Sequence, residues 1–539
     1  MKPINRFWNL LKLYKADLKQ IYIYAILSGI VNLSLPIGIQ AIINFIQMGE
    51  ISTSWILLVI FVLIGIGATG MFQVLQLRRV ENIQQDLFAR SAIEFTYRLP
   101  KISAIDTEKQ PMTDLSNRFF DTLTIQKGLP KILIDFSLSA FQIIFGLILL
   151  AVYSPYFILY GIALVFILLI IGRIIGPIGL KTSLEESKYK YKIAFWLDEV
   201  ARLNLSFKTF RKNGIHLKKT DQLTSSYLTA RLKHFKILLR QFHYFIAFKI
   251  IVAAGLLVIG GVLVFNQQMS IGQFVAAEII IIIIINSVEK LLFAIDTIYD
   301  VLTALEKIGI VTDLPLDSED GKAKPKADQG LQVEVRNLEY KFPDSFNTLF
   351  HGLNFLVKPG EKLLIKGKTG AGKSTLAQLI AGIYQVQDGQ ILINNIPVEN
   401  WDRDEFYKYV SISLPNNQLF EGTLRENIFL GNVMSDEQIE EILKQVYLDE
   451  FVNSQSEGID SLVTGVGKKI SRSLVQKIKI ARIVAASPKL VILEDPLHFI
   501  DSPQKELIIK NLTSNKDWTL IVISNEPRWE EFCNQTIKL

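Results

Sequence analysis

The stretch Gly367-Lys-Thr-Gly-Ala-Gly-Lys-Ser374 fits the phosphate-loop pattern G-x-x-x-x-G-K-[ST] at every fixed position. An apolar run, residues 362–365, precedes it as a strand would, and a helical run, residues 375–383, follows it. Glycines let backbone N–H groups close around phosphates, and the following helix directs the positive end of its dipole at them. The stretch therefore predicts a nucleotide site at the turn between a buried strand and a helix.

Each polar residue of this loop has an expected role. Lys373 would reach the β- and γ-phosphates, and the hydroxyl of Ser374 would ligate Mg²⁺. Gly370 and Gly372 would bring backbone N–H groups close to the phosphates. The residues of this region expected to contact ATP are Gly367, Thr369, Gly370, Ala371, Gly372, Lys373, Ser374 and Thr375.

The composition adds a membrane part to this nucleotide site. Of the 539 residues, 50% are hydrophobic and the mean hydropathy is +0.30, which is high for a soluble protein. The long apolar runs lie in roughly the first 300 residues. The single cysteine, Cys533, excludes disulfides within the chain and cysteine metal sites. The net charge of +6 requires no nucleic acid partner, because basic cytoplasmic loops of a membrane protein give the same value.

Six segments come near the ~20 apolar residues that a membrane-spanning helix needs. They are residues 21–46, 55–77, 132–153, 156–178, 242–265 and 271–295. The short loops at 49–54, 154–155 and 266–270 contain no Lys or Arg, whereas the long connections at 78–131 and 179–241 are rich in charges of both signs. By the positive-inside rule, the long connections and both termini lie in the cytoplasm, where the nucleotide domain finds ATP.

A polar segment, residues 313–330, separates the membrane part from the rest of the chain. It is rich in charged residues, Gly and Pro, as linkers are. Beyond it, residues 331–336 alternate like a strand, and the apolar runs 489–493 and 519–524 are typical of buried parallel strands. The predicted fold is an all-α six-helix transmembrane domain over residues 1–312, followed after the linker by an α/β P-loop NTPase domain over residues 331–539.

Further motifs accompany the phosphate loop. They are Arg98-Leu-Pro100, Ser270-Ile-Gly-Gln273, Pro359-Gly-Glu361 and FEGTLRENI at residues 420–428. With these motifs, nearly the whole chain resembles the ATP-binding cassette (ABC) exporters of the half-transporter type, in which one six-helix membrane domain is fused to one nucleotide-binding domain. The motifs are most similar to those of lipid, peptide and type I secretion exporters.

This resemblance implies a dimer in the cytoplasmic (inner) membrane, with the nucleotide-binding domains in the cytoplasm. Two ATP molecules with Mg²⁺ would lie between the two cassettes, each between the phosphate loop of one and the signature motif of the other. The partner would be a second copy or a different half-transporter; periplasmic adaptor proteins are a further class of partner, and no nucleic acid is expected. By resemblance, Phe342 would stack on adenine and Ser471 would be the signature serine.

Three cassette motifs of the family are altered here. Pro415 stands at the position of the metal-contacting glutamine of the Q-loop. The signature L-S-G-G-Q reads Ile470-Ser-Arg-Ser-Leu474, so Arg472 and Ser473 replace glycines whose backbone approaches the γ-phosphate. Asn525 stands where the family has its switch histidine. Each change removes a group that the resemblance assigns to ATP hydrolysis.

A fourth motif, the acidic pair after the apolar run 490–493, is reversed. Glu494 occupies the Mg²⁺-facing position and Asp495 the position of the general base. A carboxylate is present at each, but Asp is one methylene shorter than Glu, and misplacement by about an ångström can cost ~10²-fold in rate. Lys373, Glu494 and Asp495 are thus the expected catalytic residues, with ATP binding kept and hydrolysis weakened. The alternative, that variant residues restore normal turnover, remains open.

Together these features predict ATP-driven export or flipping of a lipid, peptide or protein by a dimeric ABC transporter. The alternative is a membrane-anchored regulatory subunit that binds ATP, or a non-hydrolysing partner in a heterodimeric transporter. Within the spans, Glu278 is a candidate for a substrate-path residue, because a charge in lipid is costly.

Overall fold

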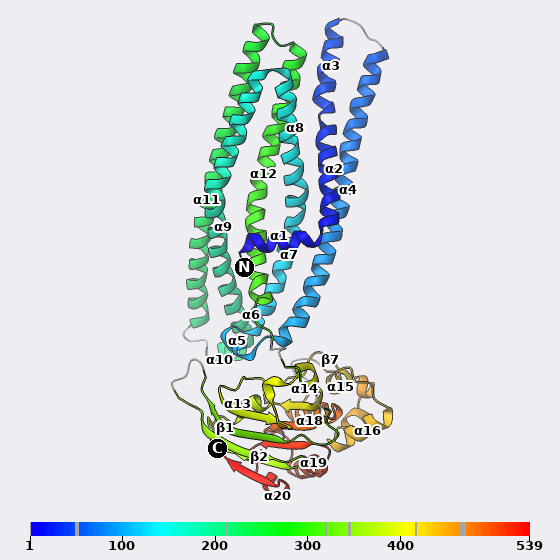
Figure 1. Ribbon diagram of the computed structural model, residues 1–539, viewed down its shortest axis with the longest axis vertical. Helices are drawn as coiled ribbons and strands as arrows, with labels where there is room; N and C mark the ends of the chain where they lie inside the picture. The colour runs from blue at the N-terminus through cyan, green and yellow to red at the C-terminus, as the bar shows by residue number, and fades with distance from the viewer. Residues whose placement is uncertain are drawn as a thin grey trace. The chain divides into compact units, whose positions relative to one another are not determined.

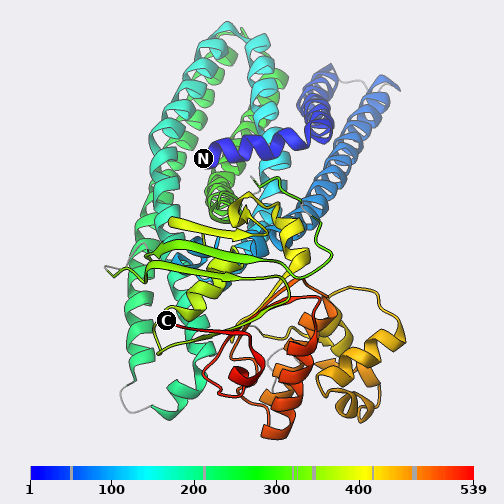
Figure 2. The same ribbon diagram turned by 60° about the horizontal axis from the view of Figure 1, so that its bottom comes forward.

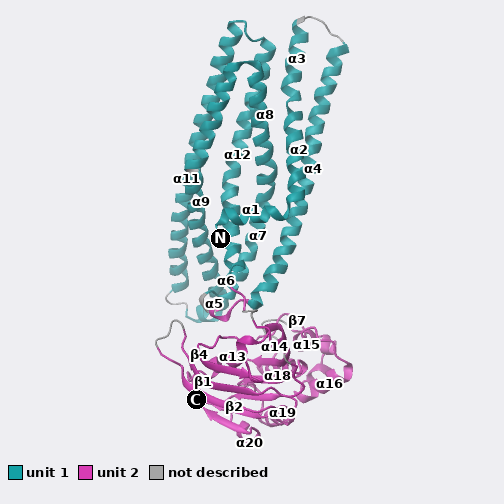
Figure 3. Ribbon diagram, in the orientation of Figure 1, with its two compact units in different colours: residues 1–101, 109–314 teal, residues 102–108, 315–539 magenta. Residues whose placement is uncertain are grey.

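The structure, a computed structural model, describes residues 2–48, 53–210, 214–317, 321–324, 326–342, 347–415, 418–463 and 470–539. The short loop predicted at residues 49–54 therefore lies largely outside the described residues. The chain divides into two compact units (Figure 3). The first comprises residues 1–101 and 109–314, and the second residues 102–108 and 315–539.

Among its described residues, the first unit consists of helices and the short turns that join them (Figure 1). Its helices are α1 (Pro3–Leu13), α2 (Lys15–Asn32), α3 (Ser34–Met48), α4 (Thr53–Arg98), α6 (Met112–Asn117), α7 (Asp121–Pro130), α8 (Ser137–Tyr153), α9 (Pro155–Arg202), α10 (Asn204–Thr209), α11 (Ile215–Phe265) and α12 (Ile271–Thr312). A π-helical turn, Lys131–Phe136, joins α7 to α8 after Pro130. Helix α12 begins with a capping box, in which the side chains of Ser270 and Gln273 each accept a hydrogen bond from the other's backbone N–H.

Six helical segments among the described residues are long and apolar enough to cross a membrane. They are Lys15–Gln47, Thr53–Lys101, Met112–Tyr153, Pro155–Arg202, Ile215–Phe265 and Ile271–Thr312. Each contains one of the six apolar runs of the sequence and several extend far beyond it; α11, for example, has 51 residues. The prediction of a six-helix membrane domain is confirmed.

The second unit contains the strands and the remaining helices. The strands are β1 (Val333–Tyr340), β2 (Phe350–Val357), β3 (Lys362–Lys366), β4 (Asp388–Ile393), β5 (Ile396–Pro397), β6 (Val410–Ser413), β7 (Gly422–Thr423), β8 (Leu462–Val463), β9 (Leu490–Glu494), β10 (Thr519–Ile523) and β11 (Gln535–Lys538). The helices are α13 (Lys373–Ile380), α14 (Arg403–Tyr409), α15 (Leu424–Phe429), α16 (Asp436–Gln445), α17 (Asp449–Asn453), α18 (Arg472–Ala485), α19 (Ser502–Ser514) and α20 (Trp529–Phe532).

Two sheets organise this unit. One is fully parallel in the order β11-β3-β10-β9-β6, and the other is antiparallel in the order β2-β1-β4-β5. In Figure 2 the green and yellow strands of the antiparallel sheet lie at the left of the second unit, and the orange helices lie at its right. Strands β3, β9 and β10 are almost entirely buried, as their continuous apolar runs predict. The prediction of an α/β domain is confirmed.

The parallel sheet determines which loops meet. The carboxyl ends of parallel strands lie along one edge, where ligands of such folds bind. Strand β3 is followed there by the phosphate loop, β10 by Ser524, β9 by Asp495 and β6 by Pro415. Segments more than 150 residues apart in the sequence therefore converge at one edge.

The segment 102–108 belongs to the second unit although it lies within the first long connection of the membrane part. Helix α5 (Ala104–Lys109) begins there, and Ala104 and Ile105 pack against the hydrophobic core of the second unit. Residues 318–320 and 325 of the predicted linker lie outside the described residues. Its Ala323 exchanges backbone hydrogen bonds of 3.0 Å with the strand-like segment before α14, as donor to Asn400 and as acceptor from Asp402.

Candidate nucleotide-binding site

The phosphate loop has the backbone conformation that its glycines allow. Gly370 and Gly372 adopt φ values of +86° and +84°, which favour glycine. A Cβ atom on Gly372 would lie 2.7 Å from Leu349 and 2.9 Å from Phe350, so the loop closes tightly there, whereas a Cβ on Gly370 would meet no heavy atom within 4 Å. The space beside Gly370 is thus open, and we expect the phosphates to lie there.

Lys373 bends back over the loop from the first position of α13. Its Nζ donates hydrogen bonds of 2.9 Å to the carbonyl oxygens of both Gly367 and Lys368. The ammonium group is therefore held at the rim of the loop, beside the start of the helix. A phosphate placed on the N-terminal end of α13 would find this positive charge next to it.

Ser374 and Glu494 lie together although 120 residues separate them. The hydroxyl of Ser374, in the first turn of α13, donates a hydrogen bond to Oε1 of Glu494, at the end of β9. These are the two residues expected to hold Mg²⁺. A hydroxyl and a carboxylate are hard oxygen ligands, which suit a Mg²⁺ ion completed by phosphates and water. Among the described residues no group of three or more His, Cys, Asp or Glu side chains could hold a metal ion.

These groups fit a nucleoside triphosphate with Mg²⁺. The open space at Gly370 and the start of α13 would hold phosphates, Lys373 would pair with them, and Ser374 and Glu494 would hold the metal. Bound Mg²⁺ would neutralise phosphate charge during transfer. Phe342, expected at the adenine, follows β1 and packs edge-on against Tyr340 and Tyr384, with ring centroids 5.3 and 5.9 Å away.

Asp495 has an unusual backbone conformation. Its φ of +40° is uncommon for a residue other than glycine, although Asp tolerates it better than most. Its N–H donates to the carbonyl of Ile523 at 2.9 Å, and its Oδ1 accepts a hydrogen bond of 2.9 Å from Ser524 Oγ. Asp495 is thus fixed to the end of β10 through both its backbone and its carboxylate. Asn525, at the position of the switch histidine, is exposed.

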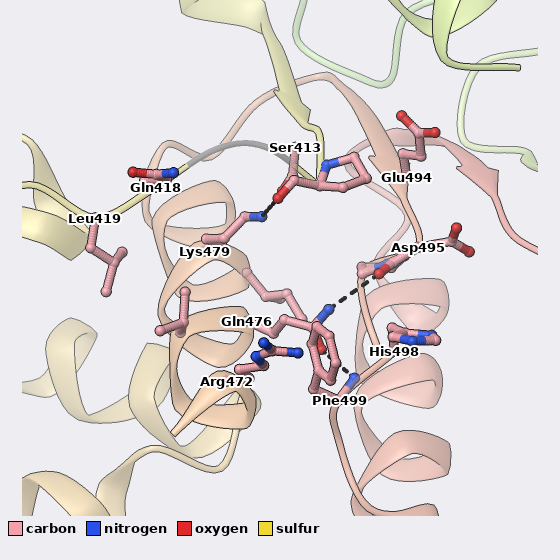
Figure 4. A pocket seen from close by; sticks show the side chains of 14 residues that line it. Ser413, Gln418, Leu419, Arg472, Gln476, Lys479, Glu494, Asp495, His498 and Phe499 are labelled. Carbon is pink, nitrogen blue, oxygen red and sulfur yellow. Dashed lines mark hydrogen bonds between the residues drawn. The ribbon is translucent and has the colours of Figure 1, made fainter. Parts of the chain in front are cut away.

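A cavity of about 530 Å³ borders the acidic pair (Figure 4). It is lined by Ser413, Pro415, Gln418, Leu419, Arg472, Val475, Gln476, Lys479, Ile480, Glu494, Asp495, Pro496, His498 and Phe499. Arg472, Gln476 and Lys479 come from one face of α18, because positions i, i+4 and i+7 share a face. Asn416 and Asn417, which follow Pro415, lie outside the described residues.

Lys479 is a residue of this cavity wall that the motifs did not indicate. Its Nζ donates to the carbonyl oxygens of Leu414 at 2.9 Å and Pro415 at 3.3 Å. Burial, and secondarily the nearby Arg482, lower the pKa of Lys479. An ammonium group therefore contacts the backbone of the Q-loop, where Pro415 offers no polar side chain. The only signal in the sequence was a Lys at a position of α18 that shares a face with Gln476.

Two other residues of the same helix face contact the segment after β9. Gln476 donates from Nε2 to the carbonyl of Asp495 at 3.3 Å and accepts from the N–H of Phe499 at 2.8 Å. The guanidinium of Arg472 lies over the ring of Phe499, 5.1 Å from its centroid. Ser471 caps α18, accepting from the N–H of Leu474 at 3.2 Å, and is exposed. Helix α18 therefore contacts both Pro415 and Asp495.

Two protein families match this chain. The family described as ABC transporter matches residues 350–498, and the family described as ABC transporter transmembrane region matches residues 21–288. A bacterial Atm1-family ABC exporter solved with ATP bound has the same fold, with a TM-score of 0.84 at 18% identity over 97% of this chain and 93% of that one.

Two curated relatives illustrate the sequence similarity. An uncharacterized ABC transporter ATP-binding protein of Haemophilus influenzae is 31% identical over 41% of this chain and 40% of its own length. The alpha-hemolysin translocation ATP-binding protein HlyB of Escherichia coli O157:H7 is 26% identical over 49% of this chain and 38% of its own length. The chain thus spans about two fifths of the length of these relatives. With two ABC transporter families matching most of its length, the chain belongs to the ABC transporters and has the half-transporter architecture of their exporters.

Proposed function

We propose that the chain drives export or flipping of a lipid, peptide or protein across the cytoplasmic (inner) membrane, using ATP, as one half of a dimeric transporter. The observation that carries this proposal is the contact between Ser374 and Glu494 beside an open, glycine-lined phosphate loop. A fold of six apolar helices followed by a cytoplasmic nucleotide domain supports it.

Within the cassette, we assign ATP binding to the loop glycines and Lys373, and Mg²⁺ binding to Ser374 and Glu494. Asp495 would orient the attacking water. Phosphoryl transfer depends almost entirely on positioning and electrostatics, so displaced groups lower turnover more than affinity. The carboxylate of Asp495 already accepts a hydrogen bond from Ser524, which supports weakened hydrolysis.

The partner would be a second copy of this chain or a different half-transporter. The name of the relative HlyB says that it takes part in alpha-hemolysin translocation. Periplasmic adaptor proteins would be further partners of this chain if its own substrate is a protein. Another relative, of Bacillus subtilis, is named a probable multidrug resistance transporter, so the names of relatives support no single substrate class. No nucleic acid partner is proposed.

A second candidate function is that of a membrane-anchored ATP-binding regulator, or of a non-hydrolysing partner in a heterodimer. The engagement of Asp495 by Ser524 favours it, together with Arg472 and Ser473 at signature positions that are glycines in the family. In this case ATP binding would change the conformation of the chain without turnover.

The test is ATP affinity and ATP turnover of the purified chain in lipid nanodiscs, with Lys373→Ala as the control. We expect the wild-type chain to bind ATP and Lys373→Ala to lose this binding. We expect the turnover of the wild-type chain to be well below about 1 s⁻¹, the low end of typical enzyme turnover. Turnover equal to that of Lys373→Ala would favour the regulator. Loss of ATP binding in the wild-type chain would overturn both candidates.

A further inference from the structure

Among the described residues of the first unit, helix α12 leaves a narrow face exposed, and this face carries polar side chains. Between Ile271 and Lys290 the exposed residues are Ile271, Glu278, Ile282, Asn286 and Lys290. From Glu278 onward they follow one another at intervals of four, so they lie on one face of the helix. The residues between them, such as Ala277, Ile281 and Ile284, are buried. We name Glu278, Ile282, Asn286 and Lys290 the α12 stripe.

Helix α12 is also the most enclosed of the six spans. It packs against α3, α8, α9 and α11, and Figure 1 shows it running among α8, α9 and α11. Half of its most apolar window is buried, compared with 11% for the span containing α4 and 12% for α9. The stripe is thus a narrow opening on a central helix.

The two spans whose apolar windows are least buried, those of α4 and α9, have a different exposed surface. Their large exposed side chains within the apolar windows include Phe61, Leu63 and Ile64 on α4, and Leu159, Ile162 and Leu169 on α9. We expect lipid tails to cover this apolar surface. An acid and an amide on α12 would be costly against the same lipid, because hydrocarbon offers them no hydrogen bonds.

Glu278 is placed where it cannot easily escape hydrocarbon. It lies seven residues after the start of α12 at Ile271, about 10 Å along the helix axis, and a Glu side chain is too short to extend that far to the interface. Lys290, near the opposite end of the apolar run, has a long side chain that can extend to the interface. Glu278 therefore needs water or a cation beside it.

We infer that the α12 stripe lines the substrate path and that Glu278 binds a cationic group carried on an apolar body. This inference rests on the proposed transport function and adds a substrate class to it. The charge of Glu278 selects a cation, and Ile282, four residues further on, provides apolar contact. Asn286 supplies an amide that donates and accepts hydrogen bonds. The shared chemistry is that of an amphiphilic organic cation or of a peptide with basic side chains.

Two other occupants fit the stripe less well. A lipid tail would cover Ile282 and leave the carboxylate of Glu278 and the amide of Asn286 without partners. A second copy of α12 packed directly on the stripe across a two-fold axis would bring two Glu278 carboxylates toward each other, and like charges repel. A cation between the two copies relieves this repulsion, which is the arrangement that we propose.

The test measures binding of two probes to the full chain in phosphatidylcholine nanodiscs without nucleotide. The probes are tetraphenylphosphonium and a short peptide of alternating leucine and arginine. We expect at least one to bind, and Glu278→Gln to weaken that binding at least tenfold while Glu278→Asp retains most of it. Whichever probe responds to Glu278→Gln identifies the source of the cationic group.

Arg173→Gln is the matched control, since it removes an exposed charge from α9, a helix whose other exposed residues are largely apolar; we expect no effect on either probe. Binding of neither probe to the wild-type chain, or equal binding to Glu278→Gln, would overturn the inference. A change of oligomeric state in Glu278→Gln would overturn it in favour of a direct contact between copies. Because no ATP is used, these results are independent of the Lys373→Ala experiment that tests the proposed function.

Discussion

The hydroxyl of Ser524 donates a hydrogen bond of 2.9 Å to Oδ1 of Asp495, the carboxylate that we propose as the general base. Ser524 lies directly after β10, and Asp495 directly after β9, on neighbouring parallel strands. The backbone N–H of Asp495 also donates a hydrogen bond to the carbonyl of Ile523, the last residue of β10, and the φ of Asp495 is positive. The backbone and the side chain of Asp495 are thus both directed toward β10. The short Asp side chain is therefore held toward β10, and a longer acid at this position could extend further.

We predict that the double variant Glu494→Asp/Asp495→Glu, which restores the order of the family, increases ATP turnover at least tenfold. Moving a base by about an ångström can change the rate ~10²-fold. ATP affinity should change little, because both positions keep a carboxylate. The measurement is turnover at saturating ATP in nanodiscs, with Asp495→Asn as an inactive reference. Turnover no faster than wild type would place the limiting defect at Pro415, at Asn525 or in the altered signature instead.

Lys479 offers a second test. We predict that Lys479→Met lowers turnover several-fold and accelerates hydrogen exchange of residues 410–414, because the carbonyl oxygens of Leu414 and Pro415 lose their shared donor. A positioning role further predicts a smaller change in ATP affinity than in turnover, and partial rescue by Lys479→Arg.

Lys477 provides the matched control. It is also a buried lysine of α18 whose ammonium donates to a backbone carbonyl, that of Tyr447 at 2.9 Å, but it does not line the cavity. Lys477→Met should accelerate hydrogen exchange around Tyr447 and leave turnover per folded molecule unchanged. Equal losses of turnover in the two variants would show that Lys479 contributes only to folding.

The phosphate loop permits a comparison between two glycines of the same backbone conformation. Gly370→Ala and Gly372→Ala both force alanine into the left-handed region, at a cost of about 1–2 kcal/mol. Only Gly372→Ala adds a clash, with Leu349 and Phe350, which typically costs a further ~1–3 kcal/mol. We predict a thermal midpoint for Gly372→Ala several degrees below that of Gly370→Ala. Equal thermal midpoints of the two variants would mean that Leu349 and Phe350 move aside without a cost in stability.

Much of the fold and part of the site could be predicted from local sequence. The turn from β3 into α13 is encoded in a few consecutive residues, and apolar run lengths indicated six spans. The proximity of Ser374 and Glu494 follows from the meeting of parallel strand ends. The contacts of Lys479 with Leu414 and Pro415, and of Ser524 with Asp495, could not be predicted, because they depend on how α18 and the two strand ends pack in three dimensions. The φ of Asp495 has no sequence signal either.

The last prediction concerns pH and two groups beside the parallel sheet. Lys362, at the start of β3, donates to the carbonyl oxygens of Asn515 and Trp518, each at 2.7 Å. Burial lowers the pKa of Lys362 from its ordinary value of 10.5 to about 8. Burial raises the pKa of the nearby Cys533 thiol from 9.0 to about 11. Each group therefore titrates differently in the folded and unfolded chains.

Between pH 8 and 9 the unfolded chain keeps the proton of Lys362 while the folded cassette loses it, so the free energy of unfolding rises with pH, by about 1 kcal/mol. Above pH 9 the unfolded chain loses the Cys533 proton that the folded cassette retains, and this opposing effect stops the rise. Scanning calorimetry of the detergent-solubilised chain should therefore show the cassette's thermal midpoint increasing from pH 8 to 9 and then levelling. Lys362→Met should abolish the increase, and Cys533→Ala should extend it towards pH 10.5. An increase that persists in Lys362→Met would assign it to another group.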